Sequence, residues 1–278
     1  MKAAPFAYER PSDLNTALAL MAKPGGMIKI MAGGQSLGPM LNLRLVQPDL
    51  IIDIAGLSEL KQAERDGDEL LIGACITHAD IEDGRIPDVT RGAMQRVASM
   101  IAYRAVRNRG TIGGSLSHAD PSADWLSALA ALGASLRLRS LAGVRHLTIS
   151  EFVTGALESA MKPGEIVEAV RVPAMASSAR FGYVKSCRKT GEFAHAMSAV
   201  VIDPDAGTAR VVIGALETAP MLLDQPTELF GGSLNGEFGR KFDARVADAL
   251  LMKAGISNAV DRHIHVSVLR RAIAEASQ

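Results

Sequence analysis

Two glycine-rich segments constrain this chain more than any other feature of its sequence. The first reads Ala32-Gly33-Gly34-Gln35-Ser36-Leu37-Gly38, and the second reads Gly110-Thr111-Ile112-Gly113-Gly114-Ser115. Paired glycines let a backbone pass close to a ligand with its N–H groups turned outward, and a helix start that follows adds a partial positive charge. Each segment therefore suits a phosphate. Two of them suit the two phosphates of a dinucleotide.

Neither segment matches the commonest nucleotide-binding motifs. No Gly-Lys-Ser/Thr follows either one, so the sequence gives no support to nucleoside triphosphate hydrolysis, and neither is a Rossmann Gly-x-Gly-x-x-Gly. One such segment alone can equally be a tight turn that only joins packed elements. The shared layout of the two favours ligand binding.

Composition and charge exclude several classes of function. The 278 residues are 48% hydrophobic, which is enough for one large core or two medium ones. Thirty basic and thirty acidic residues leave no net charge, so we expect neither nucleic acid nor an anionic membrane surface as a partner. Cys75 and Cys187 are far apart and the histidines show no ligand spacing, so we expect no metal or iron–sulfur cluster on this chain.

The amino-terminal sequence gives an expectation about location. Residues 1–10 lack the apolar core of a signal peptide, and no run of about eighteen uncharged apolar residues follows. We therefore expect a cytoplasmic protein without membrane insertion.

Apolar spacing predicts an alternation of helices and strands that changes character late in the chain. Up to Pro173 it predicts helices at 11–21, 77–81, 90–104 and 121–132, with Thr77 as the cap of the second and Asp120 as the cap of the fourth. In the same part it predicts strands at 27–31, 50–54, 69–76, 136–139, 144–149 and 166–172, and a polar turn at 61–67. Beyond it we expect strands at 181–186, 196–203 and 209–215 and helices at 244–254 and 266–276. Boundaries near Leu57 and in the small-residue stretch 174–179 divide the chain into residues 1–57, 58–176 and 177–278.

Three segments of the sequence resemble a known protein family. The segments Met31-Ala32-Gly33-Gly34-Gln35-Ser36-Leu37, Asn108-Arg109-Gly110-Thr111-Ile112-Gly113-Gly114-Ser115 and Ala119-Asp120-Pro121-Ser122-Ala123-Asp124 are similar to the FAD-binding medium subunit of molybdenum hydroxylases, such as carbon monoxide dehydrogenase and xanthine dehydrogenase. The resemblance continues through 163–167 and 183–185. It implies an α+β fold: a two-subdomain FAD-binding domain of the vanillyl-alcohol-oxidase (PCMH) type, then a C-terminal domain with a three-stranded antiparallel sheet and helices.

The same resemblance implies which residues hold the FAD. Residues 31–38 would wrap the pyrophosphate and flavin side, residues 111–115 the other phosphate face, Ile101 and Val167 the adenine, and Asp124 the adenosine end. Lys185 would lie near the flavin ring, and Phe193 would stack on it, with His195 behind. The expected cofactor-binding residues are Met31, Ala32, Gly33, Gly34, Gln35, Ser36, Leu37, Gly38, Ile101, Thr111, Ile112, Gly113, Gly114, Ser115, Asp124, Val167, Lys185 and Phe193.

Several of these residues have a plainer alternative. Many relatives have Asn where this chain has Ser115, Asp124 can simply stabilise a helix start, and Lys185 can be a solvated surface lysine. Ile101 and Val167 can equally be core. Gln35 stands where some flavoproteins of this fold carry the histidine that binds FAD covalently, so we expect a dissociable FAD.

By resemblance, the function is that of an electron-transfer subunit without a catalytic residue of its own. Substrate oxidation would occur at a molybdopterin centre on a large subunit, and electrons would pass through [2Fe–2S] clusters on a small subunit to the flavin and on to NAD, a quinone or oxygen. The assembly implied is a dimer of heterotrimers. Two alternatives stay open: a self-sufficient FAD-dependent oxidoreductase of the same fold, and a non-catalytic nucleotide-binding module.

Overall fold

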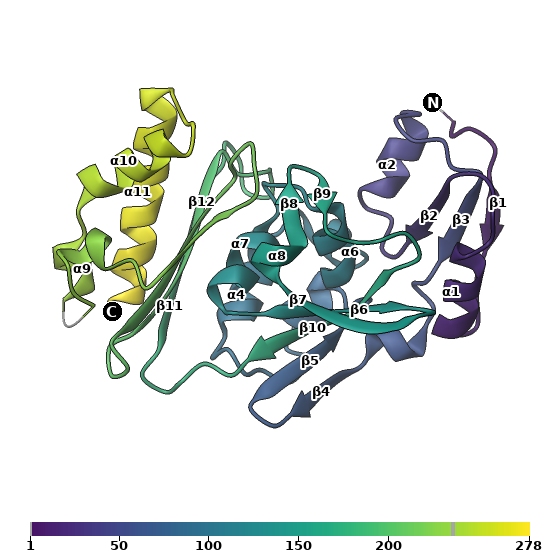
Figure 1. Ribbon diagram of the computed structural model, residues 1–278, viewed down its shortest axis with the longest axis horizontal. Coiled ribbons are helices and arrows are strands. Elements are labelled where there is room, and N and C mark those ends of the chain that lie inside the picture. The colour runs from purple at the N-terminus through teal and green to yellow at the C-terminus, as the bar shows by residue number, and fades with distance from the viewer. Residues whose placement is uncertain (1, 235–236) are drawn as a thin grey trace.

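Three large β-sheets follow one another along the long axis of the computed structural model (Figure 1). The structure describes residues 2–234 and 237–278. The N-terminal sheet has three strands, the central sheet five and the C-terminal sheet four, and a two-stranded ribbon accompanies the central one. This mixture of helices with parallel and antiparallel sheets is the α+β class expected from the sequence.

The N-terminal sheet delivers the chain into the first glycine segment. It is parallel in the order β1-β3-β2, formed by β1 (Ala7–Glu9), β2 (Ile28–Met31) and β3 (Leu50–Asp53). Helix α1 (Leu14–Met21) packs on it and begins after Asp13, whose carboxylate accepts a hydrogen bond from the backbone N–H of Thr16 at 2.7 Å. The first glycine segment follows β2 directly and leads into α2 (Leu37–Asn42).

The central sheet is antiparallel in the order β4-β5-β10-β6-β7. Its strands are β4 (Ala63–Asp66), β5 (Glu69–Gly73), β6 (Ser135–Ser140), β7 (Gly143–Thr148) and β10 (Ile166–Pro173). The prediction of a polar turn at 61–67 is wrong: η1 (Ser58–Lys61) ends at its start, and β4 occupies most of the range. An edge strand with little burial shows no alternation of apolar and polar residues, so its sequence does not reveal it.

Short helices connect these strands. They are α3 (His78–Glu82), α4 (Ala93–Met100), α5 (Arg104–Arg107), α6 (Ile112–His118), α7 (Asp124–Ala131) and α8 (Ile149–Phe152), and the ribbon is β8 (Val153–Gly155) with β9 (Glu158–Ser159). As expected, Thr77 caps the first of them. The second glycine segment supplies the first turn of α6 rather than a loop ahead of a helix.

Two of the expected helices need correction. The helix expected at 90–104 is interrupted after Met100, where Ala102 adopts a left-handed φ of 42°. The helix expected at 121–132 begins only at Asp124, because the carboxylate of Asp120 accepts from the N–H of Ser122 at 2.9 Å and closes a turn. Asp120 therefore stabilises the turn before α7 instead of capping α7.

The C-terminal sheet is covered on both faces. It is antiparallel, in the order β11 (Arg180–Ser186), β12 (Ala196–Asp203), β13 (Thr208–Gly214) and β14 (Met221–Asp224), followed by η2 (Thr227–Phe230), α9 (Phe238–Lys241), α10 (Ala244–Lys253) and α11 (Ala259–Ala276). Three strands were expected; β14 is the fourth, and its length of four residues is too short for a recognisable pattern. A Cβ on Gly182 would lie 1.9 Å from the carbonyl oxygen of Ala272, so α11 lies directly against β11.

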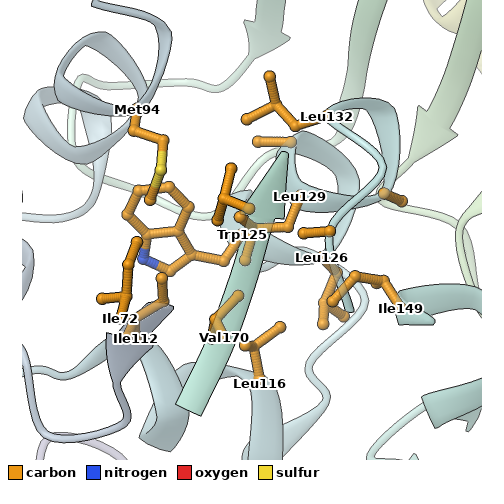
Figure 2. Packing of buried hydrophobic residues seen from close by; sticks show 14 of the residues in the cluster. Ile72, Met94, Ile112, Leu116, Trp125, Leu126, Leu129, Leu132, Ile149 and Val170 are labelled. Carbon is orange, nitrogen blue, oxygen red and sulfur yellow. The ribbon is translucent and has the colours of Figure 1, made fainter. Parts of the chain in front are cut away.

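The largest core joins the central sheet to the C-terminal sheet. Figure 2 shows the fully buried indole of Trp125, on α7, packed among Met94 of α4, Ile72 of β5 and Ile112 of α6. On its other side α7 packs against β12 and β13. Among the described residues, no helix is both long and apolar enough to cross a membrane.

A buried histidine in this core makes the stability sensitive to acid. Burial, and next the positive charge of Arg107, lowers the pKa of His78 to about 4 from the ordinary value of 6.5. The unfolded chain therefore takes up a proton as the pH falls below 6.5, while the folded chain does so only near pH 4. We predict that the free energy of unfolding falls by up to about 3 kcal/mol between these pH values.

The check is urea unfolding at a series of pH values. His78→Asn removes the titrating group, so its stability should vary less with pH over this range than that of the original chain. Equal slopes for the two proteins would contradict the assignment to His78.

Candidate functional site

A cavity of about 940 Å³ lies where the first glycine segment meets the second. The end of β2, the first turn of α6, the start of β10 and the connection between β11 and β12 all contribute to its wall. Of the residues expected to bind the cofactor, those that line it are Met31, Ala32, Gly33, Gly34, Gln35, Ser36, Leu37, Ile101, Thr111, Gly113, Gly114, Ser115, Asp124, Val167 and Phe193. Gly38, Ile112 and Lys185 are not part of the lining.

The two glycine segments touch each other at Gly33. A Cβ on this residue would lie 2.1 Å from the carbonyl oxygen of Arg109 and 2.9 Å from the Cα of Gly110. No side chain fits in that space, so residue 33 must be glycine for the segments to approach this closely. Gly34 then turns the chain with a left-handed φ of 69°.

The first segment leaves a run of backbone N–H groups without partners. Within the described residues, no acceptor takes the N–H groups of Gly34, Gln35, Ser36 or Leu37. The side chain of Gln35 donates instead to the carbonyl of Gly33 at 3.1 Å and so holds the turn. Successive unpaired N–H groups on a turn form a concavity that binds anions. The free donors of this segment therefore suit an anion such as a phosphate.

The second segment uses its N–H groups differently from what the sequence suggested. Those of Ile112 and Gly113 donate to the carbonyls of Ile76 at 3.0 Å and Ala74 at 2.9 Å. Those of Gly114 and Ser115 donate to Thr111, at 3.1 Å to its hydroxyl and 3.0 Å to its carbonyl. All four are thus engaged within the protein. The segment offers a ligand a close glycine surface and the Ser115 hydroxyl, which has no partner among the described residues.

A buried charged group forms another part of the wall. Oδ1 of Asp124 accepts hydrogen bonds from the Tyr183 hydroxyl and from Nζ of Lys185, both at 2.7 Å. The Lys185 side chain is 5% exposed and that of Asp124 is 9% exposed. Burial, and then the negative charge of Asp124, raises the pKa of Tyr183 well above its usual value, so the phenol stays protonated. Oδ2 of Asp124 has no partner in the described chain.

Lys185 therefore lies behind Asp124 rather than in the cavity wall. Its ammonium also donates to the carbonyl of Met100 at 2.8 Å. The positive charge expected beside a flavin ring is engaged with the carboxylate, and in this structure its direct effect is to hold Asp124 in place.

The remaining expected residues of the cavity wall differ in how far they are buried. Val167 is buried in the main core, and Ile101 is partly buried against it. Phe193 is 67% exposed at the rim, on the connection between β11 and β12. This connection is positioned by Gly191, where a Cβ would lie 2.9 Å from the carbonyl oxygen of Ala102.

Sequence reasoning missed some residues of the wall. Tyr103 is 59% exposed and lines the cavity with its neighbour Ala102, and the buried His78 lines it beside Gly110. None of these three residues belongs to a recognisable motif. Their positions follow from the break after α4 and from contacts between distant segments, which the sequence does not display.

The chain is similar to known proteins over most of its length. A family model described as the FAD binding domain in molybdopterin dehydrogenase matches residues 4–175. The caffeine dehydrogenase subunit beta of Pseudomonas sp. (strain CBB1) is 30% identical over 97% of this chain and 100% of its own. The carbon monoxide dehydrogenase medium chain of Hydrogenophaga pseudoflava is 34% identical over 78% of this chain and 76% of its own.

Solved structures extend the likeness to the whole chain. The crystal structure of quinoline 2-oxidoreductase from Pseudomonas putida 86 contains a chain that superposes with a TM-score of 0.87 at 29% identity, covering 100% of this chain and 99% of that one. The resemblance inferred from the glycine segments is confirmed. This chain belongs to the family of FAD-binding domains of molybdopterin dehydrogenases, the medium subunits of molybdenum hydroxylases.

Proposed function

We propose that this chain is the FAD-binding electron-transfer subunit of a multi-subunit molybdenum hydroxylase. In this role it accepts electrons from iron–sulfur clusters on a small subunit and passes them to an external acceptor. The observation that carries the proposal is the run of unpaired N–H groups from Gly34 to Leu37, which faces the cavity and is held against the second glycine segment.

The residues of the cavity fit an FAD. The unpaired N–H groups of the first segment suit the pyrophosphate, and the glycine surface of the second lets it approach closely. Oδ2 of Asp124 is a free acceptor for a ribose hydroxyl, and Ile101 and Val167 offer an apolar surface to the adenine. Phe193 at the rim is available to the flavin ring. A volume of about 940 Å³ is at the upper end of the range for ligand cavities.

The chain's own residues bind and orient rather than react. When bound, the flavin supplies the ability to take up electrons from one carrier and deliver them to another. Buried groups such as Tyr183 and Asp124 fix the shape of the cavity wall, and no side chain is required as a general acid or base.

The partners follow from the proposed role. Cys75 and Cys187 are the only cysteines, too few for iron–sulfur clusters, so the clusters belong to a small subunit. A large subunit would carry the molybdopterin and select the substrate. We propose a dimer of heterotrimers with cytoplasmic location as the working arrangement.

The division into parts near Leu57 and at 174–179 also stays a proposal. Each boundary falls between two sheets: β3 ends at Asp53 before β4 begins at Ala63, and β10 ends at Pro173 before β11 begins at Arg180.

The full chain should be purified alone and together with its co-expressed partner subunits. We expect the lone chain to bind FAD without a covalent bond and to release it on denaturation, with no substrate turnover. Its yellow absorption should decrease when the reduced iron–sulfur subunit is added. Turnover by the lone chain would favour a self-sufficient oxidoreductase. Absence of FAD even in the assembled complex would contradict the proposal.

Gly33→Ala tests the contact between the glycine segments. The new methyl group would meet the carbonyl of Arg109 and force the segments apart, so we predict FAD binding weaker by about ten- to a hundredfold. Titration of FAD into the chain, followed by flavin fluorescence, measures this. Gly239→Ala on α9 is the matched control, because its Cβ would be 3.3 Å from the Ser277 hydroxyl oxygen and Gly239 does not line the cavity. Equal affinities in the two variants would be incompatible with the predicted clash.

Asp124→Asn tests the buried ion pair. It leaves the Lys185 ammonium without its counter-charge, so we predict a loss of about 3–5 kcal/mol in the free energy of unfolding, measured by urea without FAD. The double variant Asp124→Asn with Lys185→Met removes the stranded charge as well and should recover most of the loss. If the double variant is no more stable than the single one, the ion pair is not the reason for the cost.

A further inference from the structure

His78 and Trp125 form a hydrogen bond that determines the tautomer of the histidine. The indole Nε1–H of Trp125 lies 3.0 Å from Nδ1 of His78, and both residues are buried. An indole nitrogen can only donate, so Nδ1 must be the acceptor and carries no proton. The proton of the neutral ring is therefore on Nε2.

The Nε2 edge of the ring faces the second glycine segment. A Cβ on Gly110 would lie 2.9 Å from both Nε2 and Cδ2 of His78, so only a glycine leaves room for the ring there. His78 contributes to the cavity wall although it is only 5% exposed. Among the described residues, Nε2 has no hydrogen-bond partner.

The Nε2–H group supplies a hydrogen-bond donor where the second glycine segment has no free backbone donor. The N–H groups of the second segment, from Ile112 to Ser115, are all engaged within the protein, so its backbone has little to offer a ligand oxygen. The Nε2–H of His78 is a fixed donor on a side chain that is 5% exposed and lines the cavity beside Gly110. A ligand oxygen that accepts from it would satisfy a donor that has no protein partner.

The ring is also kept neutral. Burial is the larger cause, because it disfavours the charged imidazolium. The positive charge of Arg107, whose Nε lies 2.7 Å from Oε2 of Glu82, acts in the same direction. The imidazole therefore donates one hydrogen bond without bringing a positive charge into the cavity.

We propose that His78 is a cofactor-positioning residue, whose Nε2–H, fixed in direction by Trp125, donates to an oxygen of the bound dinucleotide beside Gly110. This inference rests on the proposed function, since the acceptor belongs to the FAD. It adds to the two glycine segments a side chain that no motif of the sequence indicates.

The tautomer can be tested without any cofactor. Trp125 is the only tryptophan, so its indole N–H gives a single resonance in a ¹⁵N–¹H spectrum of the full chain. We expect this resonance to be retained in His78→Asn, whose side-chain oxygen can accept in place of Nδ1, and to shift in His78→Phe. Nitrogen resonances of ¹⁵N-histidine should show His78 with its proton on Nε2. A proton on Nδ1 would overturn the proposal.

Two further variants test the donor itself by FAD titration. His78→Asn keeps the acceptor for Trp125 but lacks Nε2–H, and should bind FAD about tenfold more weakly. His78→Gln carries an amide N–H toward the position of Nε2 and should recover most of the affinity. If His78→Asn binds as tightly as the original chain, or if both variants lose the same affinity, the hydrogen bond to FAD is refuted.

The two proposals fail in different ways. If the original chain and its assembled complex bind no FAD, the proposed function fails and this inference with it. If the original chain binds FAD and His78→Asn binds it equally well, only the role of His78 fails.

Discussion

The contact between Gly33 and the carbonyl of Arg109 is the constraint on which the site depends. It joins the end of β2, in the N-terminal sheet, to the loop before α6, in the central region. Because a side chain at position 33 has no room, the two segments can share one cavity only with glycine there. With the first segment held in this way, the N–H groups from Gly34 to Leu37 remain free for an anion.

Three parts of the chain contribute to the cavity wall in different ways. The first glycine segment offers unpaired N–H donors. In the second segment the N–H groups donate to Ala74, Ile76 and Thr111, so this segment contributes a fixed backbone surface to the cavity wall. The C-terminal sheet contributes Tyr183 and Lys185, which hold one oxygen of Asp124 and leave the other open. Polar groups that are paired on one side and open on the other give a site a fixed shape before any ligand arrives.

Short-range sequence patterns predicted much of the fold and of the candidate site. Contacts between residues far apart in the sequence account for what was missed. The cap at Thr77, the strand at 50–54 and the glycine segments are short-range patterns, and the segments were specific enough to indicate the family. The pairing of Lys185 with Asp124 spans 61 residues and that of Trp125 with His78 spans 47, so neither has a local signature. Asp120 was misplaced because the same residue type suits both a helix cap and a turn.

The most direct test of the account is the response of the backbone amides of the first glycine segment to FAD. In ¹⁵N–¹H spectra of the full chain, the resonances of Gly34, Gln35, Ser36 and Leu37 should move strongly downfield when FAD binds, as N–H groups do on donating to a phosphate. The already engaged amides of Ile112 and Gly113 should move little. If FAD binds while the resonances from Gly34 to Leu37 stay unchanged, the phosphate lies elsewhere and the account is wrong.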